Sequence, residues 1–236
     1  MSATATEAVR NQLLAALPRK DLHRLLAHLE PVRLGIGQVL YEPGVDIRHC
    51  YFPSEGVISL LTVLAPGKTA EVGMVGPEGL VGMSAAAGIK LSQLRAVVQG
   101  QGSALRMKAG RLEKEVAASG ALQRSLFRFT LVLMGQVTQV AACNRFHRAE
   151  MRMARWLLVT RDRLRANSFR MTHELLAQMI GARRVGVTNA AGNLAKRNLI
   201  SYSRGNVRVL DVSGLRAASC ECYEVAKGQY AATPVG

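Results

Sequence analysis

Hydrophobic and polar positions follow three different patterns along the chain. Between about residues 32 and 108, strand-length apolar runs recur about every ten residues, with glycine and proline turns between them. Over 118–146, apolar residues recur at steps of three and four without a proline, which predicts one long helix. Over 172–198, two short helical patterns meet at Gly181, and the LISYSRGNVRVLD that follows predicts a tight hairpin.

These patterns predict an α+β protein of three parts. We expect an N-terminal double-stranded β-roll (jelly roll), a long dimerisation helix and a C-terminal winged helix-turn-helix. The expected boundaries are 1–117 for the β-roll sensor domain with an N-terminal helix, 118–147 for the long helix, and 148–236 for the winged helix-turn-helix with a helical tail.

The helix-turn-helix is predicted residue by residue. Thr172 is placed to cap the first helix, and Glu174 lies in the first turn, where the helix dipole favours an acid. Gly181 stands where a chain leaving a helix commonly needs a positive φ. The expected buried positions of the two helices are Leu175, Leu176, Met179, Ile180, Val187, Ala190, Ala191 and Leu194.

The opposite face of the second helix is polar and predicts contact with DNA. The residues expected to read bases are Arg184, Val185, Thr188 and Asn189. Those expected to meet phosphates are Thr172, Arg183, Lys196, Arg197 and Arg204. The alternative is an ordinary helical hairpin whose basic side is solvated.

A heptad-like stripe on the long helix predicts a homodimer. Its expected seam is formed by Leu126, Leu133, Val137, Val140 and Asn144. The alternative is that this stripe packs against its own domain.

Charge supports a polyanionic partner. The whole chain carries a formal net charge of +15, and residues 151–210 hold twelve Lys or Arg against two acids, which leaves +10 in this segment. A membrane would also attract this charge, but the basic residues flank a compact glycine-containing motif, not one long amphipathic helix. We see no apolar stretch long enough to span a bilayer and no signal peptide, and we expect a cytoplasmic protein without a membrane partner.

Metal and catalytic chemistry are not predicted. Cys50, Cys143, Cys220 and Cys222 lack the spacing of a zinc site or a disulfide framework, so we expect reduced thiols and no metal. The five histidines are scattered, which disfavours a cupin-like metal enzyme. The sequence contains no P-loop, G-x-S-x-G or H-E-x-x-H motif, and we expect no catalytic residues. The tail SGLRAASCECYEVAKGQY predicts one short helix capped by Ser213, with Cys220, Cys222 and Tyr223 in packing roles.

From about Leu13 to Leu210, the chain resembles the Crp/Fnr family of bacterial transcription regulators. The resemblance rests on the order of the parts, on GQVLYEPG and YFPSEGVIS in the β-roll, and on THELLAQMIGARRVGVTNAAGNLAKRNLISYSRG in the C-terminal half. It implies a homodimer on double-stranded DNA with a near-palindromic site, a small-molecule or nucleotide effector bound in the β-roll, and contact with RNA polymerase.

The effector pocket departs from the cyclic-AMP-binding members of that family. The matching positions are Gly79, Leu80, Gly82, Arg95 and Ala96. Leu80 stands where the resemblance implies a glutamate for the ribose, and Ala96 replaces the serine beside the phosphate-binding arginine. Cyclic AMP is therefore disfavoured, which leaves another nucleotide, another small ligand or none, although Arg95 without its serine could still take an anion.

Three further alternatives stay open at this stage. An iron–sulfur cluster is disfavoured because Cys50 is the one cysteine of the β-roll half. Haem is not excluded, since His49 and Cys50 are adjacent. The chain could also be a cyclic-nucleotide-binding-like interaction module that does not read DNA.

Overall fold

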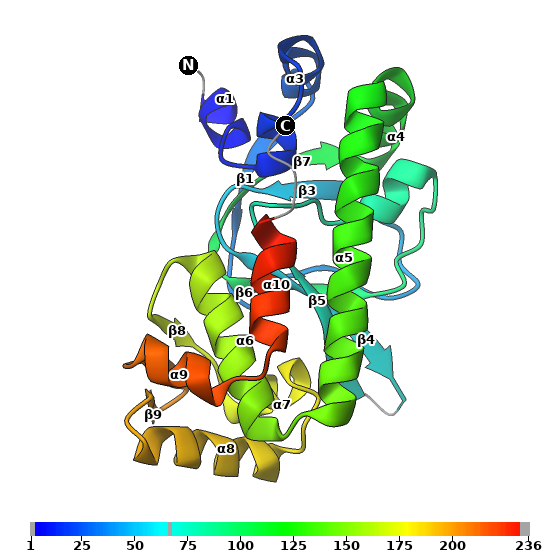
Figure 1. Cartoon of the computed structure of the whole chain (residues 1–236). Helices are drawn as coiled ribbons and strands as arrows, with labels where there is room; N and C mark the ends of the chain where they lie inside the picture. Colours follow the sequence, from blue (N-terminus) through cyan, green and yellow to red (C-terminus); the bar gives the residue numbers. More distant parts are fainter. Residues whose placement is uncertain (1–2, 66–67, 232–236) are drawn as a thin grey trace. The chain divides into compact units, whose positions relative to one another are not determined.

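The computed structural model describes residues 3–65 and 68–231 and divides the chain into two compact units (Figure 1). The first unit contains the chain up to Val63 together with Gly73–Met134. The second contains Leu64–Val72 and Gly135–Gln229. The boundary therefore falls inside the long helix rather than at one of its ends, and the first five residues of β5 (Lys68–Val75) belong to the second unit.

The first unit begins with short helices and continues as an antiparallel β-roll. The helices are α1 (Ala3–Ala8), α2 (Gln12–Ala15) and α3 (Arg19–Leu26). One sheet has the order β1-β7-β3 and the other β2-β6-β4-β5. The bounds are β1 Glu30–Leu34, β2 Val39–Tyr41, β3 His49–Pro53, β4 Val57–Leu64, β5 Lys68–Val75, β6 Arg95–Gly100 and β7 Gly102–Lys108. A 3-10 helix, η1 (Met83–Ala87), lies between β5 and β6, and the predicted β-roll is confirmed.

The long helix is preceded by a short one and a break. Helix α4 (Ala109–Ala118) ends at Ser119, and α5 spans the 27 residues Gly120–Phe146. The Ser119 hydroxyl oxygen accepts a hydrogen bond from the backbone N–H of Leu122 at 3.1 Å, which satisfies one of the free donors at the start of α5. The long helix expected over 118–146 is therefore present as Gly120–Phe146.

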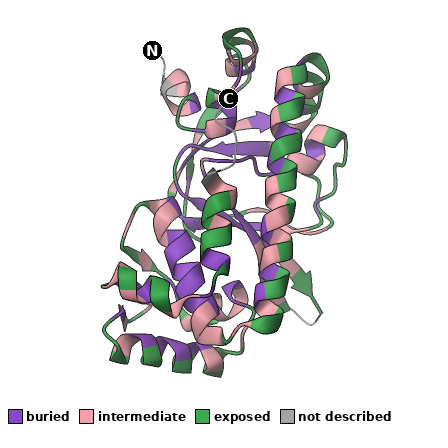
Figure 2. Cartoon of the chain, in the orientation of Figure 1, coloured by how far each residue is buried: buried purple, intermediate pink, exposed green. Residues whose placement is uncertain are grey.

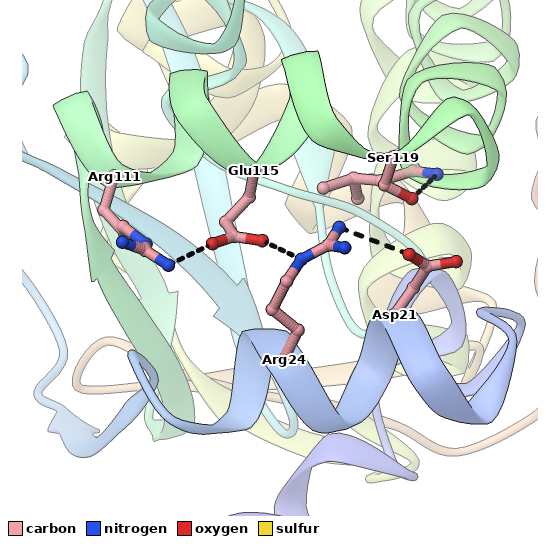
Figure 3. A network of polar contacts seen from close by, with 6 residues as sticks. Asp21, Arg24, Arg111, Glu115 and Ser119 are labelled. Carbon is pink, nitrogen blue, oxygen red and sulfur yellow. Dashed lines mark hydrogen bonds and ion pairs between the residues drawn. The ribbon is translucent and has the colours of Figure 1, made fainter.

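A buried carboxylate joins α4 to α3 (Figure 3). Glu115 is 3% exposed; it accepts a 2.6 Å hydrogen bond from Nε of Arg24 and pairs with Arg111 one turn earlier on α4. Burial works against ionisation of Glu115, but hydrogen bonds from Arg24 and Arg111 outweigh it and lower the pKa of this carboxyl. The network therefore links α3 to α4, the helix that precedes α5.

The predicted dimer seam is wrong in part. Leu126 and Val140 are only 5% and 8% exposed within the single chain, so they pack inside it. The side chain of Leu133 lies against Gly73, and Asn144 packs against Gly181. Val137 is half-buried. Leu126 and Val140 are therefore covered by their own chain, which was the alternative interpretation of this stripe.

A second apolar stripe on α5 is exposed. Phe127, Leu131 and Met134 are 63%, 47% and 57% exposed, and the same alternation of four and three continues through Thr138 and Ala141, which are also exposed. By length and apolar composition, α5 also meets the criterion for a membrane span, contrary to our expectation from the sequence. A helix with one buried and one exposed apolar face satisfies the same criterion.

The second unit holds the remaining elements. They are α6 Ala149–Leu164, β8 Ser168–Arg170, α7 His173–Met179, α8 Arg184–Lys196, β9 Ile200–Ser203, β10 Asn206–Val209, α9 Val212–Ala218 and α10 Cys222–Ala231. Figure 2 shows α6 buried along most of its length. Its Trp156 is fully buried and donates from the indole Nε1 to Glu71 at 2.9 Å.

The tail differs from the single helix that we expected. It forms two helices, α9 and α10, and the cap of α9 is Asp211, whose carboxylate accepts a hydrogen bond from the N–H of Gly214 at 3.0 Å. The hydroxyl of Ser213 donates to Asp211 instead of capping the helix. An ionised carboxylate is the stronger acceptor at a helix N-terminus, which explains why Asp211 takes this place.

Candidate nucleic-acid interface

The turn between α7 and α8 has the predicted geometry. The Thr172 hydroxyl oxygen accepts a hydrogen bond from the N–H of Leu175 at 3.2 Å, as expected of a cap. Gly181 has φ +60°, and the Cβ of any other residue would lie 3.1 Å from the side-chain amide nitrogen of Asn144. Both backbone conformation and close packing therefore require glycine here.

Helix α8 has one buried and one open face, as predicted. Val187, Ala190, Ala191 and Leu194 are buried, whereas Arg184, Val185 and Asn189 are exposed. Val185 is 71% exposed, which is unusual for a branched apolar side chain and leaves its methyl groups free to meet a partner. Arg184 is the first residue of α8, at the end that approaches base edges in DNA-binding helices of this type.

Thr188 is exposed, but its hydroxyl already has partners inside the motif. Its hydroxyl oxygen lies 3.1 Å from both the backbone carbonyl oxygen of Arg184 and Nδ1 of His173. The hydroxyl therefore serves contacts inside the motif.

His173 and Tyr202 form a contact that the sequence did not predict. Their rings stack with centroids 4.4 Å apart, and the Tyr202 hydroxyl donates to the carbonyl oxygen of Met171 at 2.8 Å. Burial, reinforced by the nearby charge of Arg184, lowers the pKa of His173, so its neutral form prevails at neutral pH. The pair holds α7, α8 and the hairpin together. The one signal in the sequence was the presence of two aromatic rings, His173 in α7 and Tyr202 in β9.

The wing is a sheet of three strands in the order β8-β10-β9, one more than the predicted hairpin. The two residues of the β9–β10 turn, Arg204 and Gly205, have φ values of +47° and +76°. Two successive positive φ values are typical of the tight turn that suits the twist of a hairpin. The turn places Arg204, which is exposed, at the tip of the wing.

The remaining predicted phosphate contacts fall into two groups. Arg183, the N-cap residue of α8, and Lys196 in its last turn are exposed. Arg197 is held by Glu150, whose carboxylate accepts from Nη1 at 3.1 Å and from the side-chain amide of Asn193 at 3.0 Å. Arg197 would have to leave this pair to reach a phosphate.

Part of the positive charge of this segment is interior. Arg152, Arg155 and Arg163 are 9%, 4% and 8% exposed. They contribute to the +10 counted from the sequence but not to a contact surface. The basic surface is therefore smaller than the composition implied, and Arg183, Arg184, Lys196 and Arg204 belong to it.

The predicted effector pocket is largely filled by the protein itself. Leu80 and Ala96 are buried, and a Cβ at Gly79 would lie 2.2 Å from the ring of Phe129. Gly82 has φ +90°. Arg95 is not free, because Nε donates to the Glu42 carboxylate at 2.7 Å.

A separate hollow of about 340 Å³ lies elsewhere in the β-roll and contains none of these five residues. It is lined by Arg33, Leu34, Gly35, Glu55, Gln101 and Gly102.

A capped helix, a glycine turn, a second helix with an open basic face and a wing define the class of winged helix-turn-helix domains. Residues 151–218 match the family model of the Crp-like helix-turn-helix domain. A search of curated proteins finds no match. The second unit thus contains a Crp-like helix-turn-helix domain.

Three solved structures of similar fold each cover 80–82% of the chain. FixK2 from Bradyrhizobium japonicum is 16% identical with a TM-score of 0.68, over 81% of this chain and 98% of that one. The c-di-GMP-responsive global regulator CLP from Xanthomonas campestris is 16% identical with a TM-score of 0.65, over 82% and 100%. A CRP-family transcriptional regulator from Thermus thermophilus is 21% identical with a TM-score of 0.63, over 80% and 96%. The chain therefore has the fold of Crp/Fnr transcription regulators.

Proposed function

We propose that the chain is a sequence-specific DNA-binding transcription regulator that acts as a homodimer in the cytoplasm. The observation that carries this proposal is the exposed N-terminal face of α8, on a domain that matches the Crp-like helix-turn-helix. No part of the proposal requires catalysis.

Arg184 and Asn189 suit direct base readout. The guanidinium of Arg184 presents two parallel donors that match the two acceptors on the major-groove edge of guanine. The side-chain amide of Asn189 matches the acceptor and donor of adenine. Val185 lies between them in sequence and suits the methyl group of thymine.

The phosphate contacts are assigned to the residues around this face. Arg204 at the wing tip and Lys196 near the end of α8 are exposed and flank the reading face along the chain. Cations at these positions would release counterions without reading the base sequence. Arg183 is the N-cap residue of α8, a position from which it can contact either a phosphate or a base.

The exposed stripe of α5 is assigned to a second copy of this chain. Phe127, Leu131 and Met134 together with Thr138 and Ala141 follow the spacing of a two-helix seam. Lipid is a poorer partner, because Arg124 and Arg128 are exposed beside the stripe. A twofold dimer also presents two copies of α8 to two half-sites.

The β-roll is assigned the sensing role. A small molecule or a nucleotide other than cyclic AMP fits better than cyclic AMP, because Leu80 is buried and Arg95 is paired with Glu42. Contact with RNA polymerase would complete the regulatory function.

The proposal is tested by selection of bound sequences from a random DNA pool at two salt concentrations. We expect enrichment of one near-palindromic motif, retained at the higher salt. Binding without a preferred motif would show that the chain binds polyanions without reading their sequence. Absence of binding at both salt concentrations would favour an interaction module.

A further inference from the structure

Three thiols and one imidazole converge in the second unit. Their ligand atoms, from Cys143, His147, Cys220 and Cys222, all lie within 4.8 Å of one another. The sulfur atoms of Cys143 and Cys220 are 3.6 Å apart, and Sγ of Cys222 is 3.6 Å from Nδ1 of His147. The three cysteines are buried and His147 is mostly so.

These distances suit one tetrahedral ion. Zinc bonds of about 2.3 Å to sulfur and about 2.0 Å to nitrogen place neighbouring ligand atoms roughly 3.5–3.8 Å apart. Three thiolates and one imidazole are a known ligand set of structural zinc sites, which hold the ion with four protein ligands and no open position. From these ligands we propose that the chain binds one zinc ion per subunit at Cys143, His147, Cys220 and Cys222.

The local structure explains how the four ligands meet. Cys143 and His147 are four residues apart at the end of α5, and the N–H of His147 donates to the carbonyl oxygen of Cys143 at 3.1 Å, so the helical spacing puts both on one face. Cys220 and Cys222 come from the junction of α9 and α10, where the N–H of Tyr223 donates to the carbonyl oxygen of Cys220 at 3.0 Å. The turn between α9 and α10 places both thiols beside the end of α5.

Groups around the ligands also fit a metal. Nε2 of His147 lies 3.2 Å from the Glu221 carboxylate, which leaves Nδ1 for the ion. Metal-binding histidines commonly direct their other nitrogen to such a carboxylate. The side-chain amide of Gln139 donates to Sγ of Cys222 at 3.0 Å. Hydrogen bonds of this kind orient ligands and stabilise thiolates.

A buried arginine completes the charge balance. Arg155 is 4% exposed, and its positive charge acts on Cys143. Within residues 3–65 and 68–231, its Nε and one of its Nη atoms have no hydrogen-bond partner. An uncompensated buried guanidinium is costly. A zinc ion with three thiolates and a neutral imidazole keeps one negative charge, which Arg155 would neutralise. Binding releases the three thiol protons to solvent and needs no oxidant.

The site would stabilise the approach to the helix-turn-helix. Asn144, next to Cys143, packs against Gly181 of the α7–α8 turn. Nη1 of Arg152 donates at 3.3 Å to the side-chain and backbone oxygens of Asn144 and to the carbonyl of Gly181. Zinc would therefore fix the end of α5 and the α9–α10 junction beside the turn.

The test measures metal in the full chain, purified without an affinity tag that binds metal and without a chelator. Elemental analysis should give one zinc per subunit in the unaltered protein and in Cys50→Ala, a matched control, because Cys50 is a buried thiol that belongs to the other unit and is not one of the four ligands. The double variant Cys220→Ser/Cys222→Ser should lose the zinc. His147→Cys should keep it, whereas His147→Ala should bind it at least tenfold more weakly.

A second measurement does not depend on whether the variants fold. After zinc is stripped from the unaltered protein, one equivalent of Co²⁺ should produce the intense visible absorption of a tetrahedral thiolate site. Zinc should then abolish it and restore the original melting temperature. Metal-free protein that gives no cobalt spectrum would overturn the proposal. So would iron in place of zinc, a Cys143–Cys220 disulfide in the purified chain, or full zinc content in the double variant.

Discussion

At the scale of residues, the proposed base readout depends on two exposed side chains of α8 with fixed hydrogen-bonding geometry. Arg184 at the start of α8 and Asn189 five residues later are exposed, while the Thr188 hydroxyl lies within hydrogen-bonding distance of His173 and of a backbone carbonyl. Specificity should therefore be lost with the first two residues and not with the hydroxyl of the third.

The first prediction compares Arg184→Ala with Arg204→Ala. Loss of the Arg184 fork should cost about 1–3 kcal/mol and relax the preference at one position of each half-site. Loss of Arg204, at the wing tip, should weaken all sequences alike and reduce the salt slope by about one unit. Sequence selection with both variants at two salt concentrations distinguishes these outcomes. An unaltered preference in Arg184→Ala would show that this residue does not read a base.

At the scale of elements, α5 carries two apolar stripes with different uses. Leu126 and Val140 bury one stripe inside the chain, and Phe127, Leu131 and Met134 expose the other. Only the exposed stripe is free to bury surface against a second copy.

The second prediction is that Leu131→Asp yields a folded monomer. A carboxylate in the seam would lose its hydration without a partner, which costs several kcal/mol and should raise the dissociation constant of the dimer at least about a hundredfold. Sedimentation measures the change. Ile89→Asp is the matched control, because Ile89 is 50% exposed in the β-roll, similar to Leu131 at 47%. A Leu131→Asp dimer as tight as the control would reject the stripe as the interface.

The third prediction concerns the Glu115 network of Figure 3. Hydrogen bonds from Arg24 and Arg111 lower the pKa of Glu115 below 4.5, its ordinary value. The unfolded chain thus binds this proton at a higher pH than the folded one, so the stabilisation is present above about pH 4.5 and is lost as pH falls through the folded pKa.

Glu115→Gln should therefore lower the melting temperature at neutral pH by a few degrees and weaken the dependence of stability on pH below 4.5. Thermal unfolding of both proteins across this range measures the difference. Parallel pH curves for the two proteins would mean that Glu115 adds no pH-dependent stability. Lys114→Gln, one residue away on the exposed face of α4, controls for the loss of a charge.

At the scale of the whole molecule, we expect the β-roll not to bind cyclic AMP, because Leu80 is buried and Arg95 is paired with Glu42. The fourth prediction is that calorimetry with cyclic AMP detects no binding in the micromolar range, because each unmatched buried polar group of the ligand costs about 1–3 kcal/mol. Arg95 would also have to leave Glu42. A micromolar isotherm that disappears in Arg95→Ala would disprove this expectation.

Features that depend on neighbouring residues were predictable from the sequence, whereas contacts between distant segments and between subunits were less predictable. The cap of Thr172, the positive φ of Gly181 and the buried face of α8 depend on neighbours within a few residues, which the sequence displays directly. Part of the predicted dimer seam is wrong because α5 is apolar on two faces, and periodicity alone does not say which face the rest of the chain covers.

The thiol cluster was missed for a similar reason. Metal-site motifs are recognised by the spacing of ligands that are close in sequence, and here only two of the cysteines, Cys220 and Cys222, are close together. The other two candidate ligands, Cys143 and His147, lie more than seventy residues earlier. The signal available was the spacing of Cys143 and His147, four residues apart, which places two ligands on one helical face.

The central claim, a twofold dimer that reads DNA through two copies of α8, is tested most directly by the spacing of half-sites. Binding is measured to a selected site in which about 5 or about 10 base pairs are inserted between the half-sites, half a turn or one full turn of DNA. We predict that the half-turn insertion reduces affinity to that of a single half-site, since the second α8 then faces the wrong side of the duplex. Equal affinity for the native and half-turn sites would contradict it.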